Sequence, residues 1–148
     1  MTVFKEARKA DIQNVLAMME DFYAIDGYPF DVSLANRCLR EFIANASLGR
    51  CYLVLEAGDV AGYFILTFGY SFEYGGRDLF LDELYLKPTF RGMGLGQAVM
   101  KHIDSFAEDN DVKAVHLEVE RNNHQGQKLY LKNGYLSNDR SLLTKKQF

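Results

Sequence analysis

A glycine-rich segment between a strand and a helix constrains this chain more than any other part of it. The strand pattern of residues 81–86 runs into Lys87-Pro88, and the segment Arg91-Gly92-Met93-Gly94-Leu95-Gly96, called the elbow below, follows. Three glycines at alternate positions leave a run of backbone N–H groups uncovered by side chains. The helix expected behind them adds partial positive charge at its start. The elbow is therefore predicted to hold an anion such as a phosphate.

Length and composition limit the setting of this elbow. With 148 residues, 48% of them hydrophobic and 25% charged, residues 1–148 are expected to form a single globular domain. The net charge of −3 argues against nucleic acid as the main partner, because a phosphate backbone requires a basic surface. No apolar run approaches the roughly 20 residues that cross a bilayer, so no membrane partner is expected. Cys38 and Cys51 have no metal-ligand spacing and no signal-peptide pattern is present, so a cytoplasmic protein is expected.

The hydrophobic pattern predicts a mixed α/β fold with a strand–helix–strand crossover at its centre. Strands are expected over residues 3–7, 51–56, 60–70, 81–86, 114–119, 135–136 and 142–145, and helices over residues 11–25, 33–46, 94–108 and 125–133. Residues 51–56 and 60–70 are expected to form a β-hairpin around Ala57-Gly58-Asp59. The crossover runs from residues 81–86 to residues 114–119, and the elbow is its first turn.

Two common phosphate-binding motifs do not match the elbow. A P-loop requires a Lys and a Ser or Thr directly after its last glycine, but Gly96 is followed by Gln97-Ala98. A dinucleotide-binding turn requires G-x-G-x-x-G, and from Gly92 the third glycine falls at position 96 rather than 97. This spacing also argues against a nicotinamide or flavin oxidoreductase. An ordinary tight turn without a ligand remains the alternative for a lone glycine loop.

The elbow and the strand before it resemble the GNAT family of N-acetyltransferases. The family motif R/Q-x-x-G-x-G/A matches Arg91, Gly94 and Gly96 in place, and Gly92 gives the frequent Arg-Gly form. The segment Glu83-Leu84-Tyr85-Leu86-x-Pro88 is similar to the acidic and then apolar strand of the family. The match lies at the strand-to-helix turn where the family carries its motif.

A second segment, about 30 residues further along, strengthens the resemblance. Asn123, Leu129-Tyr130 and Gly134-Tyr135 match the family pattern N-x-x-A-x-x-L/F-Y-x-x-x-G-F/Y. Gly126 departs from it, since an alanine is usual at that position. The two segments stand in the order and spacing of the family, and together they are far more specific than either alone.

The resemblance implies a fold, an activity and an assembly. The fold would be a mixed, largely antiparallel, twisted sheet of six to seven strands, with helices on both faces and a central crossover whose two parallel strands splay apart. The activity would be acetyl-CoA-dependent N-acetyltransfer, in which a primary amine attacks directly in a ternary complex. Members of the family often form homodimers, so a homodimer is a further expectation.

The resemblance also implies how acetyl-CoA would bind. Its pyrophosphate would lie on the N–H groups of the elbow, and its pantetheine arm would pair with the strand backbone like an extra strand. Asn123 would bond the arm from the other side, and Arg91 would either contact phosphate or order the loop. The implied cofactor-binding residues are Leu84, Tyr85, Leu86, Arg91, Gly92, Met93, Gly94, Leu95, Gly96, Gln97 and Asn123.

Acetyl transfer to an amine requires a base and gains from an acid. An amine with a pKa of about 10.4 is neutral in only about 1 molecule in 2,500 at pH 7, so a base is needed. Asp82 and Glu83 are the first candidates, although adjacent strand residues face opposite sides unless a bulge re-aims them. Glu118 and His116 are further candidates for the base. Tyr130 matches the position of the family's tyrosine, which would protonate the departing thiolate.

The histidines and acids outside the motifs complete the predictions. His102, on an exposed-looking helix side, His116 on a strand and His124 in a loop share no ligand spacing, so no metal site is expected. Acidic residues in the loops suggest a small cationic amine as acceptor, among them Asp26, Asp31, Glu73 and Asp78. A protein N-terminus, a lysine side chain, or a non-catalytic acyl-CoA-sensing role remain the alternatives.

Overall fold

One five-stranded sheet organises the structure, a computed structural model that describes residues 1–148. The strand order is β1-β2-β3-β4-β5, and all neighbours are antiparallel except β4 and β5, which are parallel. The strands are β1 (Thr2–Glu6), β2 (Gly49–Glu56), β3 (Asp59–Ser71), β4 (Gly76–Leu86) and β5 (Ala114–Leu117). The helices are α1 (Ile12–Ile25), α2 (Val32–Ala44), α3 (Leu95–Asp109) and α4 (His124–Lys132), with short 3-10 turns at η1 (Lys9–Asp11) and η2 (Pro88–Phe90).

The chain divides into two compact units. The first, Met1–Glu118, contains the whole sheet with α1, α2 and α3, and the second, Val119–Phe148, contains α4. The single domain expected for residues 1–148 stays a prediction.

The mixed fold and the central crossover are confirmed, whereas the expected strand number is wrong. Five strands form instead of six to seven, because residues 135–136 and 142–145 are not in strands. A strand is stable only when a neighbour pairs with its backbone and covers one face. Leu136, Leu142 and Leu143 are all exposed, so these segments gain neither form of stabilisation.

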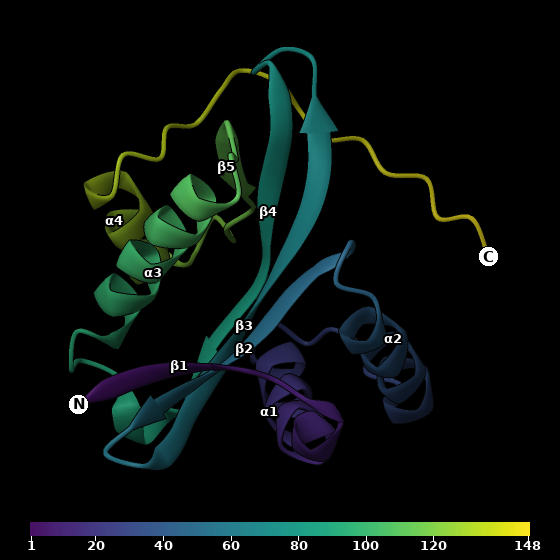
Figure 1. Cartoon of the computed structure of the whole chain (residues 1–148), viewed down its shortest axis with the longest axis vertical. Helices are drawn as coiled ribbons and strands as arrows, with labels where there is room; N and C mark the ends of the chain where they lie inside the picture. Colours follow the sequence, from purple (N-terminus) through teal and green to yellow (C-terminus); the bar gives the residue numbers. More distant parts are fainter. The chain divides into compact units, whose positions relative to one another are not determined.

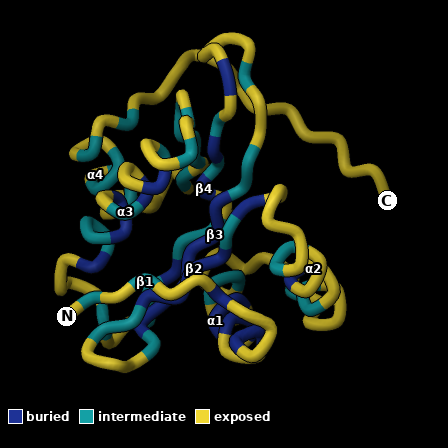
Figure 2. The backbone as a smooth tube through the Cα atoms, in the orientation of Figure 1, coloured by how far each residue is buried: buried dark blue, intermediate teal, exposed yellow.

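The helices of the first unit cover both faces of the sheet (Figure 1). On one face, α1 packs against alternate residues of β3, and Tyr63 and Ile65 lie in one buried cluster with Val15 and Leu16. On the other face, the ring of Phe68 stacks on Phe106 of α3 at 5.9 Å between centroids. The buried residues run along the middle of β2, β3 and β4, between the two helix layers (Figure 2).

A β-bulge interrupts β4 at Asp82. Ile65 pairs with Glu83 and Leu66 pairs with Leu81, so Asp82 has no partner on β3. An extra residue in one strand reverses the alternation of side chains beyond it. Leu81 therefore faces the α3 side with Leu66, whereas Glu83 faces the α1 side with Ile65. The bulge therefore decides toward which face of the sheet each acidic side chain of β4 is directed.

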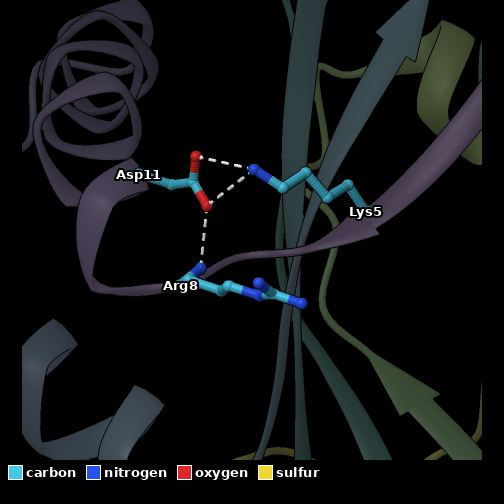
Figure 3. A network of polar contacts seen from close by, with 3 residues as sticks. All are labelled: Lys5, Arg8 and Asp11. Atoms are coloured by element: carbon cyan, nitrogen blue, oxygen red, sulfur yellow. Dashed lines mark hydrogen bonds and ion pairs between the residues drawn. The ribbon is translucent and has the colours of Figure 1, made fainter.

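A carboxylate network joins β1 to the start of α1 (Figure 3). The side chain of Asp11 accepts a hydrogen bond from the Arg8 backbone N–H at 2.8 Å and two from Lys5 Nζ at 3.2 Å. The backbone bond from Arg8, with a smaller contribution from Lys5, holds the pKa of the buried Asp11 carboxyl below its ordinary value. This network fixes the corner at which the chain leaves the edge strand.

His102 lies in an aromatic setting rather than on an exposed helix side, so its expected exposure is wrong. Its ring is 4.6 Å from Phe4, 4.8 Å from Tyr52 and 5.9 Å from Phe64, measured between centroids. Its Nε2 atom is buried and has no hydrogen-bond partner. Position 102 follows Val99 by three residues and therefore belongs to the apolar stripe of α3. Burial lowers the pKa of His102, because the imidazolium would lose its hydration.

The partly buried imidazole of His102 predicts that acid destabilises the fold. With a pKa below the ordinary 6.5, folded His102 binds fewer protons than the unfolded chain, so stability falls as pH drops below about 6.5. The loss is limited to about 1.4 kcal/mol for each unit of pKa difference. Urea unfolding at pH 7.5 and pH 5.5 should show a smaller pH effect in His102→Leu than in the wild type. The exposed His124→Gln serves as control, and an unchanged pH effect in His102→Leu would contradict the prediction.

Candidate active site

The elbow has the backbone conformation that its glycines allow. After η2 the chain passes through Gly92 at φ +77° and Gly94 at φ +80°, and α3 begins at Leu95. Such φ values disfavour any residue with a Cβ atom. A Cβ at either position would meet no protein atom within 4 Å. The two glycines are thus required by the turn itself, and the space above them is open.

The N–H groups of the elbow donate no backbone hydrogen bond within the protein. None of the five from Gly92 to Gly96 donates a backbone hydrogen bond, and the first returning bond runs from Ala98 N to Gly94 O at 3.1 Å. Gln97 lies in the same first turn of α3. Successive free N–H groups at a helix start are a strong anion-binding arrangement. The elbow therefore has the geometry of a phosphate site.

Arg91 orders the elbow in this structure. Its Nε atom donates a hydrogen bond to the Leu86 carbonyl at 2.9 Å, and its guanidinium lies 5.7 Å from the ring centroid of Tyr85. Both contacts connect the loop to the end of β4. Of the two roles left open by the sequence, the loop-ordering role is the one supported by contacts.

The backbone of β4 is open on the side of β5. The parallel pairing covers only residues 78–81 of β4 and 114–117 of β5. From Asp82 to Leu86, β4 continues with β3 on one side and no strand of the sheet on the other. Leu84, Tyr85 and Leu86 lie in this open stretch. It offers main-chain groups to an extended, amide-bearing ligand.

Two tyrosine hydroxyls hold the carboxylate of Glu83. Tyr23 of α1 donates to Oε2 at 2.6 Å, and Tyr63 of β3 donates to Oε1 at 2.8 Å. The pKa of Glu83 is raised, mainly by desolvation and to a smaller extent by the nearby Asp82. The two hydrogen bonds from the tyrosine hydroxyls lower the pKa and offset part of this shift. Burial also raises the pKa of both tyrosines, so they keep their protons and remain donors. Glu83 is consequently an oriented carboxylate of increased basicity.

Asp82 has a different environment at the bulge. It is exposed, yet the protein atoms around its carboxyl raise the pKa through partial desolvation. Neither Asp82 nor Glu83 forms an ion pair with a Lys or Arg. The end of β4 next to the elbow therefore carries two carboxylates without a cationic partner from the protein.

The second unit contains Asn123 and Tyr130. Asn123 is the N-cap of α4, and its Oδ1 accepts the Gly126 N–H at 2.9 Å. A Cβ at position 126 would lie 2.6 Å from Asn123 Nδ2, so the glycine makes room for this cap. Tyr130 is partly buried on α4, where desolvation raises the pKa of its phenol, and its ring lies 6.0 Å from that of Tyr135.

The roles of Tyr23 and Tyr63 as partners of Glu83 are not apparent from the sequence. Both were visible only as aromatic residues, Tyr23 on a helical stripe and Tyr63 in a strand. The available signal was chemical: a buried tyrosine hydroxyl requires a hydrogen-bond partner, and a strand acid is one of few candidates. The partners lie 60 and 20 positions from Glu83, so the assignment requires the tertiary structure.

The arrangement defines a class: a mixed α/β fold with a glycine-rich elbow between its two parallel strands. Comparison with known proteins names the family. The model of the Acetyltransferase (GNAT) family matches residues 15–135. The chain therefore belongs to the GNAT acetyltransferase family. It is similar to thialysine N-epsilon-acetyltransferase of Bos taurus, with 26% identity over 137 residues, 86% of this chain and 80% of that protein.

Solved structures agree on the fold. An integron cassette protein from the mobile metagenome of Cole Harbour Salt Marsh matches with a TM-score of 0.86 and 29% identity, over 97% of this chain and 89% of that chain. A predicted acetyltransferase from Clostridium acetobutylicum, crystallised with acetyl-CoA, matches with a TM-score of 0.82 and 18% identity, over 98% of this chain and 96% of that one. The second likeness concerns the fold alone.

Two further observations concern metals and membranes. No group of three His, Cys, Asp or Glu side chains is arranged to hold a metal ion. None of the helices combines the length and the apolar character that a membrane span requires.

Proposed function

We propose that this protein moves an acetyl group from acetyl-CoA to a primary amine of a small, positively charged acceptor, by direct attack of the amine in a ternary complex. Acetyl-CoA would supply the acetyl group as a thioester. The observation that carries the proposal is the run of five free N–H groups from Gly92 to Gly96. It fits a pyrophosphate, and the open backbone of residues 84–86 beside it fits an amide-bearing arm.

The roles of the side chains follow from their environments. Glu83 is assigned as the proton acceptor for the incoming ammonium, directly or through water, because its raised pKa makes the ionised carboxylate a stronger base. Asp82 is the second candidate and adds negative charge beside it. Tyr130 is assigned as the proton donor to the leaving thiolate. Asn123 is assigned to the pantetheine arm through its Nδ2, since its Oδ1 already caps α4.

The charge of the acceptor is inferred from the end of β4. Asp82 and Glu83 lack Lys or Arg partners, and an ammonium would compensate both carboxylates. The bovine relative is named thialysine N-epsilon-acetyltransferase, and this name also supports an amine acceptor.

A thiol-release assay with an amine panel tests the proposal. The panel contains thialysine, short diamines, neutral and acidic amines, and peptides with free N-termini or lysines. Turnover is expected on the small cationic amines. Turnover on neutral or acidic amines alone would refute the charge argument, and turnover on peptides alone would favour a protein substrate. Tight acetyl-CoA binding without turnover on any amine would favour a sensing role.

The choice between the two carboxylates can be tested through Tyr23. Removing its hydroxyl in Tyr23→Phe takes away a hydrogen bond that stabilises the ionised form of Glu83. A bond to a charged group contributes about 1.5–3 kcal/mol, so the acidic limb of the kcat/KM profile should move upward by about one pH unit or more. The pH–rate profile measures this shift. An unmoved limb, with activity abolished in Asp82→Asn, would assign the base to Asp82 instead.

A further inference from the structure

A carboxylate–imidazole pair lies on the sheet away from Glu83. His116 of β5 has its Nε2 atom 3.1 Å from Asp78 Oδ2 of β4. An ionised carboxylate only accepts hydrogen bonds, so the Nε2 of a neutral His116 carries the proton and its Nδ1 carries a lone pair. Nδ1 makes no hydrogen bond within the protein. The His116 side chain is 35% exposed and that of Asp78 19%, so the pair is held by the protein but remains reachable.

The bulge at Asp82 places this pair on the same sheet face as Glu83. Positions 78 and 83 are an odd number of residues apart and would face opposite sides of a regular strand. Because of the bulge, Asp78 and Glu83 instead pair with Gly69 and Ile65, which share one face of β3. The neighbouring Arg77 lies on the other face, with its guanidinium 4.4 Å from the Phe68 ring centroid.

The surroundings of the pair hold it in one position. A Cβ at Gly69 would lie 2.5 Å from Asp78 Oδ1, so the carboxylate occupies the space that this glycine leaves. The imidazole lies 5.5 Å from the ring of Tyr74 and 6.4 Å from that of Phe80, between centroids. Aromatic rings and a carboxylate beside a free imidazole nitrogen favour an N–H donor with positive charge.

We propose that His116, positioned by Asp78, accepts a hydrogen bond from a second amino group of the acceptor, remote from the amine that is acetylated. This rests on the proposed function and specifies its substrate as an elongated diamine-like molecule. His116 pairs with Phe80, three positions before Glu83 on β4. At about 3.3 Å per residue, the two amino groups would be separated by roughly 10 Å along the strand.

The test compares acceptors that differ only in the second amino group. The kcat/KM of the full-length wild type is measured for α,ω-diamines of increasing chain length and for monoamines of equal length. We expect a preference for diamines that falls at least about tenfold in His116→Phe and in Asp78→Asn, mainly through KM of the diamine. Phenylalanine keeps the ring contacts of position 116, and Asp59→Asn at the β2–β3 turn is the matched control. If both substrates instead lose kcat equally, His116 acts on the reacting amine and the proposal is wrong.

Gly69→Ala provides an independent variant. The backbone at position 69 does not have the left-handed conformation that favours glycine. The new Cβ would clash only with the end of the flexible Asp78 side chain, so folding should be preserved. The displaced carboxylate should reduce the diamine preference as Asp78→Asn does. An unchanged preference in all three folded variants would overturn the proposal.

A binding measurement separates this proposal from the proposed function. The C2 proton signal of His116 is followed by NMR during titration of the wild type with a diamine or a monoamine, without acetyl-CoA. A shift caused by the diamine alone supports the second binding point, even if no amine is acetylated and the proposed function fails. Turnover on amines without such a shift would remove the second binding point and leave the proposed function intact. If neither turnover on an amine nor a shift with the diamine is observed, both proposals fail.

Discussion

Replacing Tyr130 with phenylalanine is expected to lower kcat by a factor of about 100 or more while acetyl-CoA still binds, because a positioned general acid typically contributes about 10²–10⁴ to the rate. Burial raises the pKa of the phenol, so Tyr130 keeps its proton at neutral pH and can donate it. Steady-state kinetics with the best acceptor of the amine panel, together with calorimetric titration of acetyl-CoA, measures both quantities.

The structure also explains why this substitution should be mild for folding. Burial is what raises the pKa of the Tyr130 phenol, and phenylalanine keeps the partly buried ring while removing only the hydroxyl. The ring contact with Tyr135 at 6.0 Å is retained in phenylalanine. Tyr135→Phe removes the hydroxyl of the neighbouring ring and serves as control. A kcat within about threefold of the wild type in Tyr130→Phe would assign the proton donor to another group or to water.

Gly94→Ala is expected to weaken acetyl-CoA binding by roughly a hundredfold. A Cβ at this position would project into the open space above the elbow, where a phosphate would bond the free N–H groups. Losing one or two charge-assisted hydrogen bonds of about 1.5–3 kcal/mol each accounts for an effect of this size. The strained backbone at φ +80° should also lower the free energy of unfolding by about 1–2 kcal/mol.

Gly58→Ala separates the binding effect from the strain. Gly58 lies in the β2–β3 turn at φ +85°, and a Cβ there would meet no protein atom within 4 Å, which is also true of Gly94. Both variants should lose similar stability in urea unfolding, and only Gly94→Ala should lose affinity for acetyl-CoA in calorimetry. Equal affinities for the two variants would show that the elbow does not hold the cofactor.

The elbow could be located from the sequence because its conformation is a local property. Alternate glycines between a strand pattern and a helix pattern permit positive φ at Gly92 and Gly94, and no distant contact is needed for this. The hairpin at residues 57–58 was predictable for the same reason, and its turn joins β2 to β3 as expected. The two segments that matched the GNAT pattern were sufficient to indicate the family.

The environment of the acids could not be read from the sequence. Adjacent Asp82 and Glu83 left the base undecided, because a bulge is set by the register of β3 against β4. Tyr23 and Tyr63 reach Glu83 from another helix and another strand, and Asp78 reaches His116 across the parallel pair. Such contacts depend on how separate elements pack.

The sequence by itself therefore located the glycine-rich elbow between a strand and a helix, and it indicated the family to which this protein belongs. Only the tertiary structure decided which carboxylate is held between two hydroxyls, that His102 lies among aromatic rings, and that Asp78 and Glu83 share one face. Backbone preferences of glycines act within a few residues and leave a pattern in the chain. The burial and hydrogen bonding of a side chain are decided by residues many positions away, which come together only when the sheet forms its register.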